Sequence, residues 1–158
     1  MKKCFIYMVI YIYSLSGFAQ NVNLKKNEQS ESSILNRTVI EKYYELWNNA
    51  STKELEKYIS NQIKFEDLAY DIKINSISGL KKFMSEAFQA SQNMRFKITH
   101  FIENNNNIAV EWRLSAIDTE SKKSYSVPGV SIITMKEGKI VYNKDYYDEE
   151  SINSQLTQ

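Results

Sequence analysis

Asp67 is the first residue along the chain whose setting suggests chemistry. It lies in the stretch 64–69, Lys-Phe-Glu-Asp-Leu-Ala, which we expect to form a short, mostly buried strand with Asp67 at its inner end. Burial raises the pKa of a carboxyl group toward the range useful for moving protons, and the charged form then needs hydrogen bonds to offset its cost. A second interpretation stays open, in which Asp67 only accepts hydrogen bonds from backbone amides at the strand end.

Other catalytic chemistries find little support in the sequence. No nucleotide-binding loop, serine elbow or metal-binding motif is present. His100 is the only histidine, and no neighbouring residue gives it the spacing of a metal ligand. We therefore expect no metal and no cofactor. The 20 basic and 19 acidic residues nearly cancel, and no stretch is densely basic, so we expect no nucleic-acid partner.

The first 19 residues have the three parts of a secretory signal: a basic start, an apolar run over 4–15 and small residues up to Ala19. The apolar run is shorter than the roughly 20 residues that cross a bilayer. We expect a signal peptide over 1–19, cleavage after Ala19, and a secreted or periplasmic protein with no stable membrane anchor afterwards. The polar segment 20–32 is expected to be a flexible leader before a domain over 33–158.

The periodicity of apolar residues predicts helices first and a sheet afterwards. A long helix is expected over 35–47, a second helix from a capping box at Ser51 and Glu54, and a third helix capped by Ser78. Four stretches then alternate with period two and predict antiparallel strands: 96–102, 108–114, 127–134 and 140–147. A short helix over 149–156 is more weakly indicated. The fold class is α+β: a cone-shaped, curved antiparallel sheet wrapped around a long N-terminal helix, with two further helices. Such a cone encloses a pocket.

Five motifs in this order resemble those of SnoaL-like polyketide cyclases and ketosteroid isomerases, which belong to the nuclear transport factor two superfamily. They are Val-Ile-Glu-Lys-Tyr-Tyr-Glu-Leu-Trp-Asn at 39–48, Phe-Glu-Asp-Leu-Ala at 65–69, Val-Glu-Trp-Arg at 110–113, Gly-Val-Ser at 129–131 leading to Gly-Lys-Ile-Val at 138–141, and Asp-Tyr-Tyr-Asp at 145–148. The resemblance extends over about residues 33–156. It implies the cone-shaped fold and cofactor-free proton transfer.

The resemblance assigns roles one position at a time. Asp67 matches the proton-shuttling carboxylate of the isomerases, and Tyr43 matches their oxyanion-binding tyrosine. The second oxyanion donor of the isomerases, counted from Pro128, falls on Val130, so that donor is missing. Loss of one such donor typically costs about 2.7–4 kcal/mol of transition-state stabilisation. Asp145 resembles the acid–base aspartate of the cyclases, and this match is closer.

These matches predict one pocket with polar and apolar walls. Alternation along the last strand places Asp145 on the same face as its neighbours Asn143 and Tyr147. The polar candidates are Asp67, Asp145, Tyr43, Tyr147 and Asn143, and the apolar walls are Trp112, Val130, Phe83 and Phe88. Two carboxyl groups that meet in an apolar pocket do not both ionise cheaply, so one serves as acid and the other as base. That arrangement suits enolisation of a carbonyl compound.

The sequence thus predicts an exported domain that binds a small hydrophobic, carbonyl-type molecule, with proton transfer in an isomerisation or an aldol-type cyclisation. A non-catalytic ligand-binding or protein-interaction module on the same fold is the alternative. A third interpretation is an assembly domain whose own side chains fill the pocket, and a homodimer through the outer face stays open. One scaffold hosts many functions, so the fold does not decide among them.

Overall fold

The computed structural model describes residue 31 and residues 33–157. The predicted signal peptide and almost all of the predicted leader lie outside the described residues. The chain divides into two units, Met1–Ile34 and Leu35–Gln158, and the account below concerns the second. No helix in the described part is both long enough and apolar enough to cross a bilayer.

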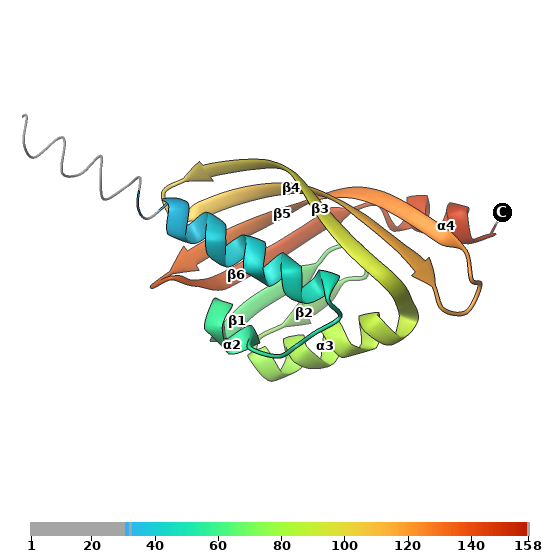
Figure 1. The fold of residues 1–158 in the computed structure, drawn as a ribbon, viewed down its shortest axis with the longest axis horizontal. Coiled ribbons are helices and arrows are strands. Elements are labelled where there is room, and N and C mark those ends of the chain that lie inside the picture. Colours follow the sequence, from blue (N-terminus) through green and yellow to red (C-terminus); the bar gives the residue numbers. More distant parts are fainter. Residues whose placement is uncertain (1–30, 32, 158) are drawn as a thin grey trace, which may run out of the picture. The chain divides into compact units, whose positions relative to one another are not determined.

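Six strands of the described chain form one curved sheet in the order β2-β1-β6-β5-β4-β3 (Figure 1). Their bounds are β1 Ile59–Asp67, β2 Ile72–Ile74, β3 Ser91–Asn104, β4 Asn107–Asp118, β5 Ser124–Lys136 and β6 Lys139–Tyr147. All neighbours are antiparallel except β1 and β6, which run parallel, so the prediction of a purely antiparallel sheet is wrong at this one pair. A long crossover through α3 and four strands separates β1 from β6, as parallel pairing requires. Strand β2 forms where an irregular connection was predicted.

The second unit contains four helices in its described residues: the first over residues 35–48, which Figure 1 leaves unlabelled, then α2 Leu55–Tyr58, α3 Ile77–Ala90 and α4 Glu149–Thr157. The predicted capping box is wrong, because α2 is one turn long and its N-cap, Glu54, has a left-handed backbone and no side-chain cap. The cap of α3 is Ser76 rather than Ser78, since its hydroxyl accepts a hydrogen bond from the Gly79 amide at 3.2 Å. The weakly predicted C-terminal helix is present.

The sheet curves around the first helix, and the core lies between them (Figure 1). The buried stripe of the helix carries Val39, Ile40, Tyr43, Tyr44 and Trp47. Along β4 and β5 every second side chain is buried, as expected for strands with one face on a core. The predicted α+β cone is therefore confirmed.

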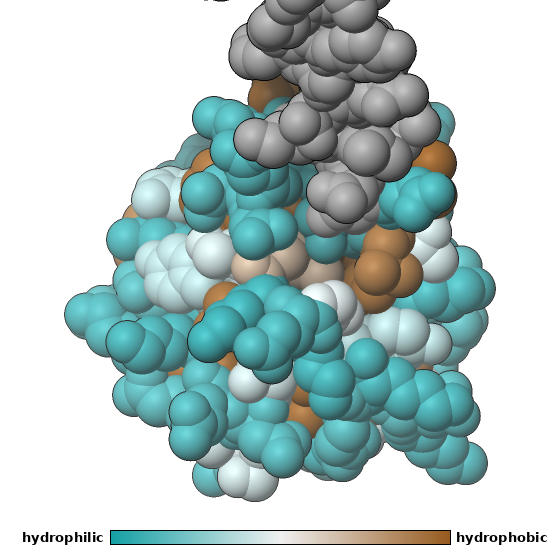
Figure 2. All heavy atoms as spheres, turned by 90° about the vertical axis from the view of Figure 1, so that its left-hand side faces the viewer, coloured by the Kyte–Doolittle hydropathy of each residue, from teal (hydrophilic) through white to brown (hydrophobic). Residues whose placement is uncertain are grey.

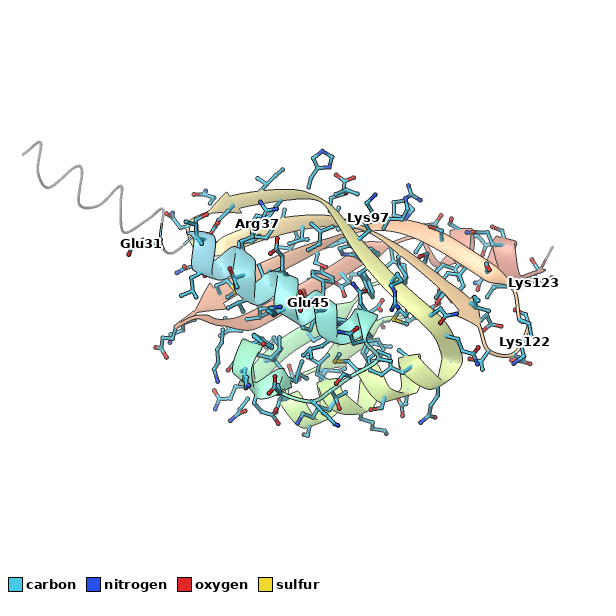
Figure 3. The ribbon with its side chains drawn as sticks, viewed as in Figure 1. Glu31, Arg37, Glu45, Lys97, Lys122 and Lys123 are labelled. Carbon is cyan, nitrogen blue, oxygen red and sulfur yellow. The ribbon has the colours of Figure 1, made fainter. Side chains whose placement is uncertain are left out.

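Most charged side chains of the described residues lie on the outside of the domain. Lys97 on β3 and the pair Lys122 and Lys123 at the β4–β5 turn are exposed and project outward (Figure 3). The face in Figure 2 is mostly hydrophilic, with apolar side chains in small, separate groups. The buried polar residues in the described part are only four, namely Asn36, Asp67, Ser131 and Asn143, so they mark where the interior is specialised.

Gly129 provides the space in which the Trp112 indole lies. The two residues are partners across β4 and β5, and a Cβ atom added at Gly129 would lie 2.2 Å from the indole Cη2 atom. Trp112 is only 2% exposed and has little room to move. We expect Gly129→Ala to lower the free energy of unfolding by about 1–3 kcal/mol, the usual cost of overpacking, in urea denaturation. Ser124→Ala, at an exposed position where β5 begins, is the control. Equal stabilities of the two variants would contradict this account.

Candidate functional site

A cavity of about 170 Å³ lies between the first helix and the concave face of the sheet. Ten of the residues that line it are aromatic: Tyr43, Tyr44, Trp47, Phe65, Tyr70, Phe83, Phe96, Trp112, Tyr125 and Tyr147. Its only charged lining residues, within the described part of the chain, are Asp67 and Asp145. Mostly apolar walls with a few convergent polar groups are typical of a ligand site.

Asp145 on β6 has one engaged and one open carboxyl oxygen. Its Oδ1 atom accepts hydrogen bonds from Ser131 Oγ at 2.5 Å and from Asn143 Nδ2 at 2.8 Å. No described residue hydrogen-bonds Oδ2. Burial raises the pKa of Asp145 to about 7, although the hydrogen bonds from Ser131 and Asn143 oppose that rise. A carboxyl group with this pKa exchanges a proton readily at neutral pH.

The Ser131 hydroxyl holds Asp145 in place. It receives the Trp112 Nε1–H at 2.8 Å and lies 2.7 Å from the Tyr44 hydroxyl. A serine hydroxyl has one proton and two lone pairs. When its proton goes to the ionised Asp145, Trp112 and Tyr44 fill both lone pairs, so Tyr44 is then the donor. The one donor and both acceptor positions of this buried hydroxyl are then used. This network fixes Asp145 Oδ1 and leaves Asp145 Oδ2 open to a proton or a ligand.

Asp67 at the end of β1 is more completely bonded. Its Oδ1 atom accepts hydrogen bonds from the amides of Ala69 at 3.0 Å and Tyr70 at 3.3 Å, and its Oδ2 atom accepts one from the Tyr147 hydroxyl at 2.8 Å. The backbone contacts are those of the second interpretation of Asp67, while the bond from Tyr147 is additional. Burial raises the pKa of Asp67, and the three hydrogen bonds oppose the rise.

The parallel pairing of β1 and β6 sets Asp67 directly beside Asp145 in the register. The charge of Asp67 adds to the rise in the pKa of Asp145. Within the described residues, no group of three His, Cys, Asp or Glu side chains gathers as a metal site. The two carboxyl groups therefore differ in their bonding: both oxygens of Asp67 accept hydrogen bonds, whereas only one oxygen of Asp145 does.

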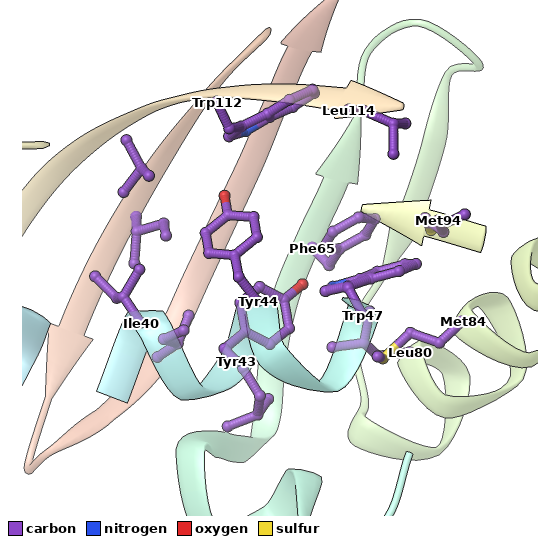
Figure 4. Close-up of a cluster of buried hydrophobic side chains, with 14 of the residues drawn as sticks. Ile40, Tyr43, Tyr44, Trp47, Phe65, Leu80, Met84, Met94, Trp112 and Leu114 are labelled. Atoms are coloured by element: carbon purple, nitrogen blue, oxygen red, sulfur yellow. The ribbon is translucent and has the colours of Figure 1, made fainter. Parts of the chain in front are cut away.

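Tyr43 lies on the same cavity as both carboxyl groups and is 2% exposed. Figure 4 shows its hydroxyl pointing toward Phe65 and Trp47, whereas the hydroxyl of Tyr44 points toward Trp112. Burial raises the pKa of Tyr43 well above its ordinary value, and the nearby Asp145 raises it further. Tyr43 therefore keeps its proton and is available as a hydrogen-bond donor.

Of the other predicted site residues, three line the cavity and a fourth binds Asp145 without lining it. Trp112, Tyr147 and Phe83 line the cavity. Asn143 is 1% exposed and is not a lining residue, but its side-chain amide donates a hydrogen bond to Asp145 Oδ1.

Two predicted wall residues lie elsewhere, so these predictions are wrong. Val130 follows the inward Gly129, and alternation turns its side chain to the outer face of β5. Phe88 on α3 packs its ring against Trp47, with 5.6 Å between the ring centroids, and does not reach the cavity.

Sequence reasoning missed Ser131 and Tyr44. The signal for Ser131 was present, because it is the one hydroxyl between Val127 and Met135 on the inward, otherwise apolar stripe of β5. A polar residue at such a position needs a partner. The signal for Tyr44 was weaker: it lies beside Tyr43 in the buried stripe of the first helix, and only the fold shows which hydroxyl meets Ser131.

Comparison of the fold with solved structures finds related domains. A protein of Catenulispora acidiphila with a ketosteroid isomerase-like fold, in complex with trimethylamine, has a TM-score of 0.71 at 13% identity, over 75% of this chain and 92% of that one. A protein of Jannaschia sp. CCS1, provisionally described as a SnoaL-like polyketide cyclase, has a TM-score of 0.71 at 12% identity, over 78% and 92%. TerC, co-crystallised with polyporic acid, has a TM-score of 0.70 at 15% identity, over 78% and 99%.

These identities show a shared fold and no more. No curated protein matches the chain. The model of the SnoaL-like domain family matches residues 40–143, which include Tyr43, Asp67, Trp112 and Ser131 and end two residues before Asp145. This match spans well over half of the chain, and the fold agrees with it. The chain belongs to the SnoaL-like domain family.

Proposed function

We propose that this SnoaL-like domain binds a small, largely apolar carbonyl compound and that Asp145 moves a proton to and from it. The observation that carries the proposal is the open Oδ2 atom of Asp145 in an aromatic cavity, with Oδ1 held by Ser131 and Asn143. A general base works best with a pKa near the working pH, and the pKa of about 7 at Asp145 meets that condition.

The size of the cavity limits the ligand. An engineered cavity of about 150 Å³ in another protein takes up benzene. The 170 Å³ available here therefore suits a compound of about one ring, and a four-ring steroid is too large. Trimethylamine and polyporic acid, which accompany two of the similar folds, support a small-molecule ligand in general.

The proposed chemistry begins at a carbon atom next to the carbonyl group. Asp145 Oδ2 accepts a proton from this carbon, and the electron pair of the broken C–H bond forms an enolate. The Tyr43 hydroxyl, which keeps its proton, donates a hydrogen bond to the enolate oxygen. If the substrate has a C=C bond next to this carbon, the enolate is conjugated with it, and in an isomerisation Asp145 returns the proton to the far carbon of that bond as the double bond moves next to the carbonyl group. In an aldol-type closure, the enolate carbon instead attacks a second carbonyl carbon, and Asp145 protonates the resulting alkoxide.

The oxyanion has fewer donors here than in the steroid isomerases. The position that would supply their second donor is Val130, on the outer face of β5. The enolate oxygen then has one hydrogen-bond donor, the Tyr43 hydroxyl, instead of two. We therefore expect slower enolisation, or a substrate whose α-proton is more acidic than that of a simple ketone.

We further propose that residues 1–19 are an export signal, on the strength of the basic start, the apolar run and the small residues before Gln20. N-terminal sequencing of the protein from its native cell should then give a chain that begins near Gln20. Recovery of a soluble cytoplasmic chain that still begins at Met1 would refute export.

Hydrogen–deuterium exchange at carbon tests the proton transfer directly. We expect the protein to speed the loss of α-proton NMR signals from one-ring ketones, such as cyclohexanone and acetophenone, in deuterated buffer. Asp145→Asn keeps the shape of the side chain but removes the base, and should slow this exchange by about 10²–10⁴-fold.

Asp71→Asn is the matched control, because it removes one carboxylate from a side chain that is 89% exposed. Thermal melts of both variants verify folding. Exchange no faster than in buffer, or exchange unchanged in a folded Asp145→Asn protein, would contradict the proposed role. Ketone binding without exchange would identify a ligand-binding module instead.

A further inference from the structure

The cavity combines aromatic walls with negative charge. Ten aromatic residues line it, and Asp67 and Asp145 are the only charged residues among the described ones that do. No Lys, Arg or His is among them. A low-dielectric cleft lined by charges of one sign concentrates ligands of the opposite sign and repels those of the same sign. Aromatic faces attract cations in addition, as in the pockets that bind organic ammonium groups. Both properties favour a cationic ligand over an anionic one.

One corner of the cavity is best suited to hold the positive charge. Burial raises the pKa of Asp67, but the three hydrogen bonds that it accepts favour its ionised form and hold its two oxygens in fixed positions. The rings of Tyr70 and Tyr147 meet beside it, with 6.2 Å between their centroids. Tyr70 is 47% exposed, so this corner reaches solvent. Glu149 lies near enough to raise the pKa of both Asp67 and Tyr70, which adds to the negative potential.

We propose that the ligand carries a protonated amine, which lies against Asp67 and the Tyr70 and Tyr147 rings while its carbonyl end faces Asp145. This inference rests on the proposed function for the carbonyl end. It gives the two carboxyl groups separate tasks: Asp67 attracts and orients the ligand, and the open Oδ2 of Asp145 moves the proton. Compounds of the same size that carry a carboxylate are excluded by charge.

Calorimetric titration at pH 7 with three one-ring probes of similar shape tests the inference. Benzylamine carries the positive charge, benzyl alcohol is neutral, and benzoate is negative. We expect benzylamine to bind about tenfold more tightly than benzyl alcohol, and benzoate to bind most weakly. Asp67→Asn should bring the affinities for benzylamine and benzyl alcohol to within about twofold of each other, with the affinity for benzyl alcohol unchanged.

Misfolding or a change in net charge alone could also alter these affinities, so a folding check and two further variants serve as controls. Asp67→Asn keeps an oxygen for the amides of Ala69 and Tyr70, and a thermal melt verifies that it folds. Tyr70→Leu removes the half-exposed ring without touching a carboxyl group, and should also reduce the preference for benzylamine. Asp71→Asn changes the net charge as Asp67→Asn does, on an exposed residue with a left-handed backbone that suits Asn, and should leave all three affinities unchanged.

The outcomes separate the two proposals. If benzylamine binds no better than benzyl alcohol, or keeps its advantage in Asp67→Asn, the amine is not recognised and the inference fails. Ketone exchange that still depends on Asp145 would leave the proposed function standing in that case. If benzoate binds best, the inference fails as well. If none of the probes binds and no ketone exchanges, both proposals fail together.

Discussion

The hydroxyl group of Ser131 joins the three elements that build the site. It links Tyr44 on the first helix, Trp112 on β4 and Asp145 on β6 through three hydrogen bonds. Each of these groups is buried or partly buried, and a buried polar group without a partner costs about 1–3 kcal/mol. The helix therefore has one favourable position on the sheet, and the orientation of the Asp145 carboxyl group follows from it.

Packing makes this network possible. Gly129, two residues before Ser131, has no side chain where the Trp112 ring lies, so the indole packs against β5 and its N–H reaches the serine. Asn143 and Ser131 both bind the same oxygen of Asp145. A carboxyl group held on one side and open on the other presents a single basic atom to the cavity. The side-chain network thus orients Asp145 so that its Oδ2 atom faces the cavity as the proton acceptor.

The two carboxyl groups show how neighbouring strands create different chemistry from the same residue type. Asp67 ends β1, where the chain turns and its own amides are free to bind it, and Tyr147 completes its bonding. Asp145 lies within β6, where the backbone amides belong to the sheet, and depends on side chains. Pairs of acids in unlike environments are a common basis for separate acid and base roles.

Much of the fold could be predicted because apolar periodicity reports directly on burial. Alternation correctly placed Asn143, Asp145 and Tyr147 on one face of β6. The same rule explains the error at Val130, since a shift of one residue in a strand moves the side chain to the opposite face. The parallel partnership of β1 and β6 depends on contacts between residues nearly 80 positions apart, which no local pattern records. For the same reason the link from Tyr44 to Ser131 required the structure.

The central claim is that Asp145 gains and loses a proton near neutral pH. Carbon-13 NMR of the protein with labelled aspartate carboxyl groups measures this directly, and the signal missing from Asp145→Asn identifies the residue. The titratable groups that face Asp145 are Asp67, Tyr43, Tyr44 and Tyr147. Asp and Tyr side chains are either neutral or negative, so none of them supplies a positive charge that would lower the pKa of Asp145. We predict a titration midpoint near pH 7. A midpoint near the ordinary aspartate value of about 3.9 would contradict the account.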